Sequence, residues 1–196
     1  MKGFERGLEK GKHMKFLIVS DIHGDAECCR AMLDAAEREG AEKILILGDV
    51  LYHGPRNDLP AGYAPKKVIE MLNAISDKIV CVRGNCEAEV DQMVLSFPCM
   101  ADTASVCDEE QGISIYMSHG HIYSPDKLPG GMPQRSAFLY GHTHILAAER
   151  RGGVLCLNPG SVSIPKGGNP KSYAIYDSGI FTIKTLEGEI LVSEGL

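Results

Sequence analysis

The feature that most constrains the fold is an apolar run that ends in a carboxylate. Residues 44–47 are branched and apolar, and Gly48 and Asp49 follow them directly. Such a run predicts a short buried strand, and the glycine allows a sharp turn where the chain leaves the sheet. Asp49 then stands at the carboxyl end of a buried strand, where ligands bind in open α/β sheets. Taken alone, Asp49 is equally suited to cap a following helix.

The same arrangement of an apolar strand and a polar exit recurs along the chain. Asp-x-His and His-x-His patterns suit extended backbone, because side chains at i and i+2 point to the same side and reach one ion. This recurrence favours a metal site over a set of unrelated caps and core histidines. The residues predicted to bind metal are Asp21, His23, Asp49, Asn85, His119, His142 and His144.

This donor set contains imidazoles, carboxylates and an amide oxygen, and it is too large for one tetrahedral zinc ion. It suits two divalent ions of intermediate hardness, with Mn²⁺ as the first expectation and Fe or Zn²⁺ as alternatives. A carboxylate shared between two ions holds them roughly 3.5–4 Å apart in two-metal phosphoesterase sites. We assign the shared role to Asp49.

The order of predicted elements indicates an α/β fold. Apolar strands alternate with helices in the first half of the chain, which predicts parallel pairing. The second half has short runs separated by turns, which are typical of antiparallel strands, and we expect two sheets packed face to face with helices outside. The predicted strands cover residues 15–20, 44–47, 78–82, 103–107, 112–118, 137–140, 146–150, 153–157, 172–177 and 179–185, and the predicted helices begin after Asp25, at Pro65 and near Glu89.

Length and charge limit the other function classes. A chain of 196 residues fits one domain, predicted over 14–196, with residues 1–13 as an N-terminal extension or a remnant of cloning. The net charge of −6 argues against a nucleic-acid scaffold. No apolar run approaches the roughly 18 residues of a membrane span. The cysteines form no CxxC pair, which indicates reduced thiols and a cytoplasmic location.

These motifs, in this order, resemble the calcineurin-like metallophosphoesterase family, and within it the small bacterial YfcE-like phosphodiesterase branch. The likeness rests on residues 47–51, 53–57, 83–86 and 158–168 and extends over about residues 14–186. It implies a four-layered α/β-β/α sandwich of two mixed sheets. It also implies a first metal held by Asp21, His23, Asp49 and His144, and a second held by Asp49, Asn85, His119 and His142.

One departure from the family concerns the residue after Asn85. Much of the family has a histidine there, thought to protonate or stabilise the leaving group, whereas this chain has Cys86. A thiol with an ordinary pKa of about 8.5 is a poor proton donor at neutral pH. Cys86 is therefore either a weak acid or an apolar filler, and His53 and His121 are the alternative acids. His121 is equally suited to orient a metal ligand.

The residues expected to act on the substrate are Asn85, Cys86, His53 and Arg56. Arg56 and Lys166 are candidates for a contact to the phosphoryl oxygens, although each is equally an exposed loop residue. The expected function is a metal-dependent phosphodiesterase that hydrolyses small phosphorylated compounds through a hydroxide held between two metal ions. The hydroxide attacks phosphorus in line, without a covalent enzyme intermediate.

Three other interpretations stay open. The same site suits a phosphomonoesterase or a cyclic-nucleotide phosphodiesterase, because the sequence does not fix the pocket. The fold also serves as a scaffold, since a retromer subunit resembles this family with a degraded metal site, but the complete ligand set here favours an enzyme. We expect a small-molecule phosphoester as partner, without a membrane, and a self-association surface wherever exposed apolar residues gather. The candidates for that surface are Leu51, Tyr52, Leu59, Tyr63 and Phe138.

Overall fold

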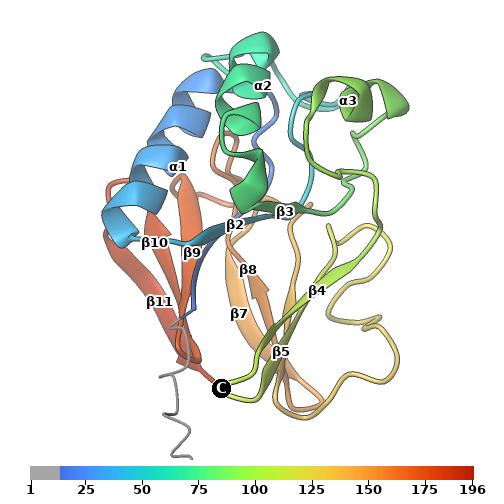
Figure 1. Ribbon diagram of the computed structural model, residues 1–196, viewed down its shortest axis with the longest axis vertical. Coiled ribbons are helices and arrows are strands. Elements are labelled where there is room, and N and C mark those ends of the chain that lie inside the picture. Colours follow the sequence, from blue (N-terminus) through green and yellow to red (C-terminus); the bar gives the residue numbers. More distant parts are fainter. Residues whose placement is uncertain (1–13) are drawn as a thin grey trace, which may run out of the picture.

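The computed structural model describes residues 14–196, so the predicted N-terminal extension lies outside the described residues. Two mixed β-sheets pack face to face, which confirms the predicted fold class (Figure 1). The first sheet contains, in order, β11 (Ile190–Gly195), β10 (Ile180–Thr185), β9 (Ser172–Asp177), β1 (Lys15–Val19), β2 (Lys43–Ile46) and β3 (Ile79–Cys81). The second contains β4 (Ala104–Asp108), β5 (Ile113–Met117), β6 (Ser136–Leu139), β8 (Val154–Asn158) and β7 (Ala147–Arg151).

Two helices lie side by side over the outer face of the first sheet (Figure 1). Helix α1 (Ala26–Glu39) begins where the Asp25 side chain accepts a hydrogen bond from the amide of Cys28, and it ends at Gly40, whose φ is 68°. These are the predicted N-cap and stop. Helix α2 (Pro65–Asn73) starts at Pro65 and is followed by a single 3₁₀ turn, η1 (Ser76–Lys78). A short helix, α3 (Glu89–Val94), follows β3.

The apolar runs of β1 and β2 are continuous because both faces of these central strands are buried. Leu17 and Val19 of β1 pack toward the helices, whereas Phe16 and Ile18 pack between the two sheets. This period of two is the geometry of a strand, and it divides one apolar run between two cores. Strands β1, β2 and β3 pair in parallel, as predicted.

The second sheet differs from the prediction that its strands are antiparallel. Strand β5 pairs in parallel with β6, and β6 pairs in parallel with β8. The segment 118–135 between β5 and β6 is long enough to return the chain to the other end of the sheet, which a hairpin turn is not. The carboxyl ends of β5 and β6 therefore lie at one edge.

The outer face of the second sheet is covered without a helix in the described part of the chain. Phe138 and Cys156 are fully buried there, against Tyr123, Leu128 and Met132 of segment 118–135. Because Phe138 is buried, it cannot belong to the predicted self-association surface, and Leu51 is excluded for the same reason. Edge strand β11 was not predicted, since its apolar stretch is short and only partly buried. Within residues 14–196, no helix is both long and apolar enough to cross a bilayer.

One buried hydrogen bond joins the two sheets. The Tyr176 hydroxyl in β9 donates to Asp108 Oδ2 in β4 at 2.6 Å, and both residues are almost fully buried. A buried acceptor that loses its donor bears the full cost of desolvation.

We therefore expect Tyr176→Phe to lower the free energy of unfolding by roughly 1–3 kcal/mol, because the Asp108 carboxylate loses a charge-assisted bond. Urea denaturation measures this change. Tyr116→Phe is the matched control, because the half-buried Tyr116 hydroxyl makes no hydrogen bond within residues 14–196. Equal stability of the two variants would contradict a role for the bond between the sheets.

Candidate metal centre

The candidate ligands all follow strands whose carboxyl ends meet at one edge of the molecule. Asp21 and His23 follow β1, Asp49 follows β2 and Asn85 follows β3. The second sheet adds His119 after β5, and His142 and His144 after β6. The parallel pairing of β5 with β6 places the rings of His119 and His142 at 5.1 Å between centroids. All seven predicted ligands thus lie at this edge, as expected for ligand sites in α/β folds.

Backbone conformation sets these residues apart. Only six non-glycine residues in the part of the chain that the structure describes have a positive φ, and five of them are candidate ligands. A left-handed conformation is unfavourable for residues with a Cβ and concentrates at functional sites. The angles lie between 49° and 67° for Asp21, His23, Asp49, His142 and His144.

Two glycines allow the turns after β2 and β3 to pack against each other. Gly48 has a φ of 94°, and a Cβ at that position would clash with the backbone of Gly84. A Cβ at Gly84 would in turn clash with the carboxylate and the amide of Asp49. Only glycine therefore fits at either position, and the close contact brings Asp49 beside Asn85.

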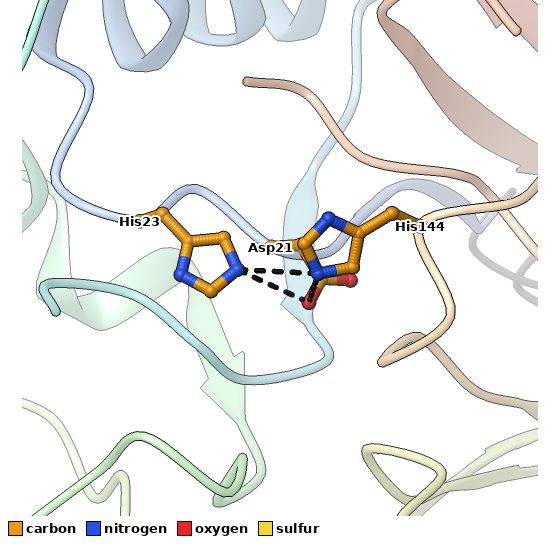
Figure 2. Close-up of side chains that lie close together, drawn as sticks. All are labelled: Asp21, His23 and His144. Carbon is orange, nitrogen blue, oxygen red and sulfur yellow. Dashed lines mark hydrogen bonds and ion pairs between the residues drawn. The ribbon is translucent and has the colours of Figure 1, made fainter. Parts of the chain in front are cut away.

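The first cluster contains Asp21, His23 and His144. Figure 2 shows the three side chains turned toward one another. Asp21 Oδ1 lies 3.3 Å from His144 Nε2 and 3.6 Å from His23 Nε2. The two Nε2 atoms are 3.4 Å apart. All three residues are buried.

The second cluster is centred on His119. Its Nε2 lies 3.4 Å from Asp49 Oδ2 and 3.1 Å from Asn85 Oδ1. The same Asp49 oxygen lies 3.7 Å from His23 Nε2, so one carboxylate oxygen faces both clusters. Its other oxygen accepts a hydrogen bond from the Cys86 amide at 2.9 Å. His142 donates its amide to Asp21 Oδ2 at 3.1 Å, which ties the two clusters together again.

Main-chain carbonyls fix the orientation of three imidazoles. The Nδ1 atoms of His23, His119 and His144 lie 2.7, 2.7 and 2.8 Å from the carbonyls of Tyr52, Leu47 and Ile164. A carbonyl oxygen only accepts, so each Nδ1 carries a proton and donates it. A ring that is neutral in this tautomer presents a bare Nε2 lone pair to the centre, which is the form that ligates metals.

The charges at the centre fit a cation. Burial alone would lower the pKa of His119, but the hydrogen bond to Asp49 and the charges of Asp21 and Asp49 raise it to about 9. Burial alone would raise the pKa of Asp49, yet the bond from His119 and its positive charge lower it well below its usual range. In the absence of a metal, a proton on His119 supplies positive charge that the carboxylates attract.

Asp21 Oδ1 adds a second observation that favours a cation. This oxygen is fully buried, and it has no hydrogen-bond partner within residues 14–196. It faces the Nε2 atoms of His23 and His144, which are acceptors in the tautomer that the carbonyls impose. Buried acceptors that face one another without a donor need a positive ion between them. The donor set therefore fits a divalent metal.

A small polar cleft opens over the two clusters. Arg56 and Lys166, both exposed, line it from two loops, together with Asn85 and His142. Cys86 also lines this cleft, and its thiol lies close to the loop at Gly54. Burial and the nearby charge of Asp49 raise the pKa of Cys86 well above its usual range. Without a bound metal, this thiol is a very weak acid.

Two predicted residues are not members of the clusters, and they differ in how close they lie to them. The His53 ring packs edge-on against Tyr52 and Tyr63, with centroids at 4.7 and 5.5 Å, and it does not line the cleft. The His121 ring lies 5.4 Å from that of His119 and 6.2 Å from that of His142. His121 is therefore beside candidate ligands, whereas His53 belongs to an aromatic cluster.

Sequence reasoning missed the role of Glu87. This buried carboxylate accepts hydrogen bonds from the amides of Asp49 at 2.9 Å, Val50 at 2.7 Å and Gly84. Burial and the Asp49 charge raise the pKa of Glu87 to about 7, although the three amide donors oppose this. Glu87 thus fastens the turn after β2 to the turn after β3. The available signal was its place two residues after Asn85.

Hydroxyl groups from the segment after β8 support the turn that carries Asp21. Ser161 and Ser163 both donate to the Asp21 carbonyl at 2.8 Å. Asn158 donates to the Gly141 carbonyl at 2.9 Å, at the start of the turn that carries His142. These bonds offset the backbone strain of the left-handed residues.

Comparison with known proteins shows the family of the chain. The Calcineurin-like phosphoesterase superfamily domain matches residues 14–179. The chain is 46% identical over 181 residues to phosphodiesterase YfcE of Escherichia coli, covering 92% of this chain and 97% of that protein. The solved structure of YfcE from E. coli superposes with a TM-score of 0.89 at 45% identity, over 93% of this chain and 99% of that one.

A more distant structure shares the fold alone. Vacuolar protein sorting 29 from Cryptosporidium parvum superposes with a TM-score of 0.62 at 17% identity, over 94% of this chain and 99% of that one. The family match covers most of the chain, and the relative from E. coli is similar over almost its full length. The chain belongs to the calcineurin-like phosphoesterase superfamily.

Proposed function

We propose that this protein is a metal-dependent phosphodiesterase that acts on small phosphorylated compounds. The observation that carries the proposal is Asp49 Oδ2, which faces His23 Nε2 of one cluster and His119 Nε2 of the other. One carboxylate oxygen between two ligand clusters is suited to bridge two ions. The similarity to a protein named phosphodiesterase YfcE supports a diester over a monoester substrate.

Each cluster supplies the ligands for one divalent ion in this proposal. Asp21, His23 and His144 hold the first, Asn85, His119 and His142 hold the second, and Asp49 is shared. Mn²⁺ suits the mixture of imidazole and carboxylate donors, and Fe or Zn²⁺ are the alternatives. When bound, such ions activate water and neutralise phosphoryl oxygens.

The residues of the chain then position the substrate. Arg56 and Lys166 line the cleft from exposed loops and donate charge-assisted hydrogen bonds to the phosphoryl oxygens. Asn85 and His142 line the same cleft. Cys86 lies at the edge of the cleft, and its weakly acidic thiol leaves the departing oxygen without a strong proton donor. Esters whose leaving groups need no proton are therefore favoured.

The scaffold alternative is less well supported. A binding scaffold does not need buried left-handed residues or imidazoles that face carboxylates, and each of these costs folding free energy. We also propose a cytoplasmic location, because all seven cysteines are free thiols. The acidic composition supports a small-molecule substrate over a nucleic acid. Tyr52 and Leu59 remain exposed, and they are the contact residues to test for self-association.

The shared carboxylate gives the first test of the metal-dependent reaction. Asp49→Ala should lower kcat/KM for bis(4-nitrophenyl) phosphate by roughly a thousandfold or more, because both ions lose a ligand. Stripping the metal from the wild type should have the same effect, and Mn²⁺ should restore its activity. Asp58→Ala, an exposed loop carboxylate outside the cleft, is the matched control. Full activity of Asp49→Ala would contradict the proposal.

Metal binding should release a proton at pH 7.5. The pKa of His119 is raised to about 9, so its ring is protonated at that pH and must lose the proton before Nε2 can ligate. Apparent Mn²⁺ affinity should therefore rise with pH up to about 9 and then level off. Calorimetry in buffers of different ionisation enthalpy measures the released proton. A binding enthalpy that is the same in all buffers would show that no proton leaves.

The thiol at Cys86 predicts a steep dependence of rate on leaving-group pKa. Aryl phosphodiesters should be hydrolysed faster than alkyl ones, and Cys86→His should raise kcat for alkyl diesters by roughly ten- to a hundredfold by supplying an acid. Cys86→Ala is the control that removes the thiol without adding an acid. If Cys86→His leaves alkyl diesters unchanged, another group already supplies the proton.

A further inference from the structure

An open apolar groove of about 410 Å³ lies beside the polar cleft. It runs between α2, α3 and the loop that follows β2. Tyr52 and Val90 on its walls are 42% and 59% exposed. Exposed apolar side chains that gather in one patch mark binding sites, whereas single scattered ones do not. The residues that form most of its wall are Leu51, Tyr52, Tyr63, Ile69, Val90 and Val94.

Groove and cleft meet at Cys86, which lines both of them. The groove is also fastened to the candidate metal centre through the main chain. His23 Nδ1 donates to the Tyr52 carbonyl at 2.7 Å, and Glu87 accepts from the Val50 amide at 2.7 Å. The groove wall therefore has a fixed position relative to the first cluster, which an unrelated surface patch would not need.

The chemistry of the wall selects an uncharged apolar group. Tyr52 and Tyr63 provide aromatic rings, and the His53 ring packs edge-on against both. The one charged residue of the wall is Asp91, whose carboxylate accepts the Ala88 amide at 2.9 Å. A negative charge there disfavours a second phosphate. A nucleobase in the groove would lose its hydrogen bonds to water and find few polar partners in their place, so the groove disfavours it as well.

We propose, resting on the proposed function, that the groove holds one apolar ester arm of the substrate while the phosphoryl group lies in the cleft. The substrate class is then a phosphodiester with at least one aryl or alkylaryl group. The volume of the groove lies within the range of small-ligand pockets. In this arrangement His53 has a positioning role, because the His53 ring packs against both tyrosines of the wall.

Symmetric diesters test this inference, since either arm can then enter the groove. Bis(4-methylphenyl) and bis(4-propylphenyl) phosphate have leaving groups of nearly equal acidity and differ by two methylenes in each arm. If the longer arm is buried, kcat/KM rises roughly three- to fourfold for each methylene, or about tenfold in total. Chromatography of the released phenols gives both rates with the metal-loaded enzyme.

Two substitutions on one helix provide the matched pair. Val90→Asp places a charge in the groove and should reduce the ratio of propyl to methyl rates to near one. Met93→Asp adds the same charge to α3 at a residue that is 83% exposed and does not line the groove, and it should leave the ratio near ten. A ratio near one in the wild type overturns the inference, although metal-dependent hydrolysis itself still supports the proposed function.

A binding measurement separates the two claims further. In methyl-labelled, Zn²⁺-loaded protein, 4-propylphenol should shift the NMR signals of Ile69, Val90 and Val94 but not that of Met93. This NMR measurement does not require turnover. Failure to hydrolyse any of the diesters would therefore overturn the proposed function without deciding whether the groove binds the phenol. No shift at the groove overturns the inference. Dissociation of an oligomer by Val90→Asp, together with no shift, would show instead that a second copy covers the groove.

Discussion

The structure depends on three imidazoles that turn their Nε2 atoms toward two buried carboxylates. Carbonyls of Tyr52, Leu47 and Ile164 impose this orientation by accepting the Nδ1 protons. Lone pairs that face carboxylates in a buried site repel one another unless a positive charge lies between them. Without a metal, protonation of His119 provides that charge, and with a metal the ion provides it. The site is therefore built around a cation.

Holding these groups together requires strain, and the surrounding structure compensates for it. Five candidate ligands adopt left-handed backbone. Glu87 binds the amides on both sides of the Asp49–Asn85 contact, and Ser161 and Ser163 bind the carbonyl of Asp21. The two apolar cores on either side of the first sheet keep the strand ends in place. The buried strands thus fix where the turns begin, and the hydrogen bonds within the turns orient the ligands.

Much of this could be predicted from the sequence, because local patterns encode it. The runs at 15–20 and 44–47 gave buried strands, and the motifs after them placed Asp21, His23 and Asp49 at one sheet edge. The direction of β6 was not predictable from local pattern, since parallel pairing depends on where the long segment 118–135 travels. The family resemblance implied that His119 and His142 lie together, but the parallel pairing that brings them together was visible only in the structure.

The roles of residues that bind main-chain groups could not be predicted from the sequence either. In the sequence, a glutamate that accepts three amide bonds looks the same as an exposed one, so the only signal for Glu87 was its place two residues after Asn85. His53, by contrast, was predicted as an alternative acid because it lies in a polar loop, yet its ring packs edge-on against two tyrosines. Tertiary contacts decide such cases, because the side chains concerned interact with groups far away in the chain.

The central claim is that two cations share Asp49, and anomalous diffraction at the manganese absorption edge tests it most directly. Crystals grown with Mn²⁺ should contain two peaks, one among Asp21, His23 and His144 and one among Asn85, His119 and His142, with Asp49 between them. Two peaks that both contact Asp49 are the predicted result. A single peak, or peaks away from Asp49, would contradict the account.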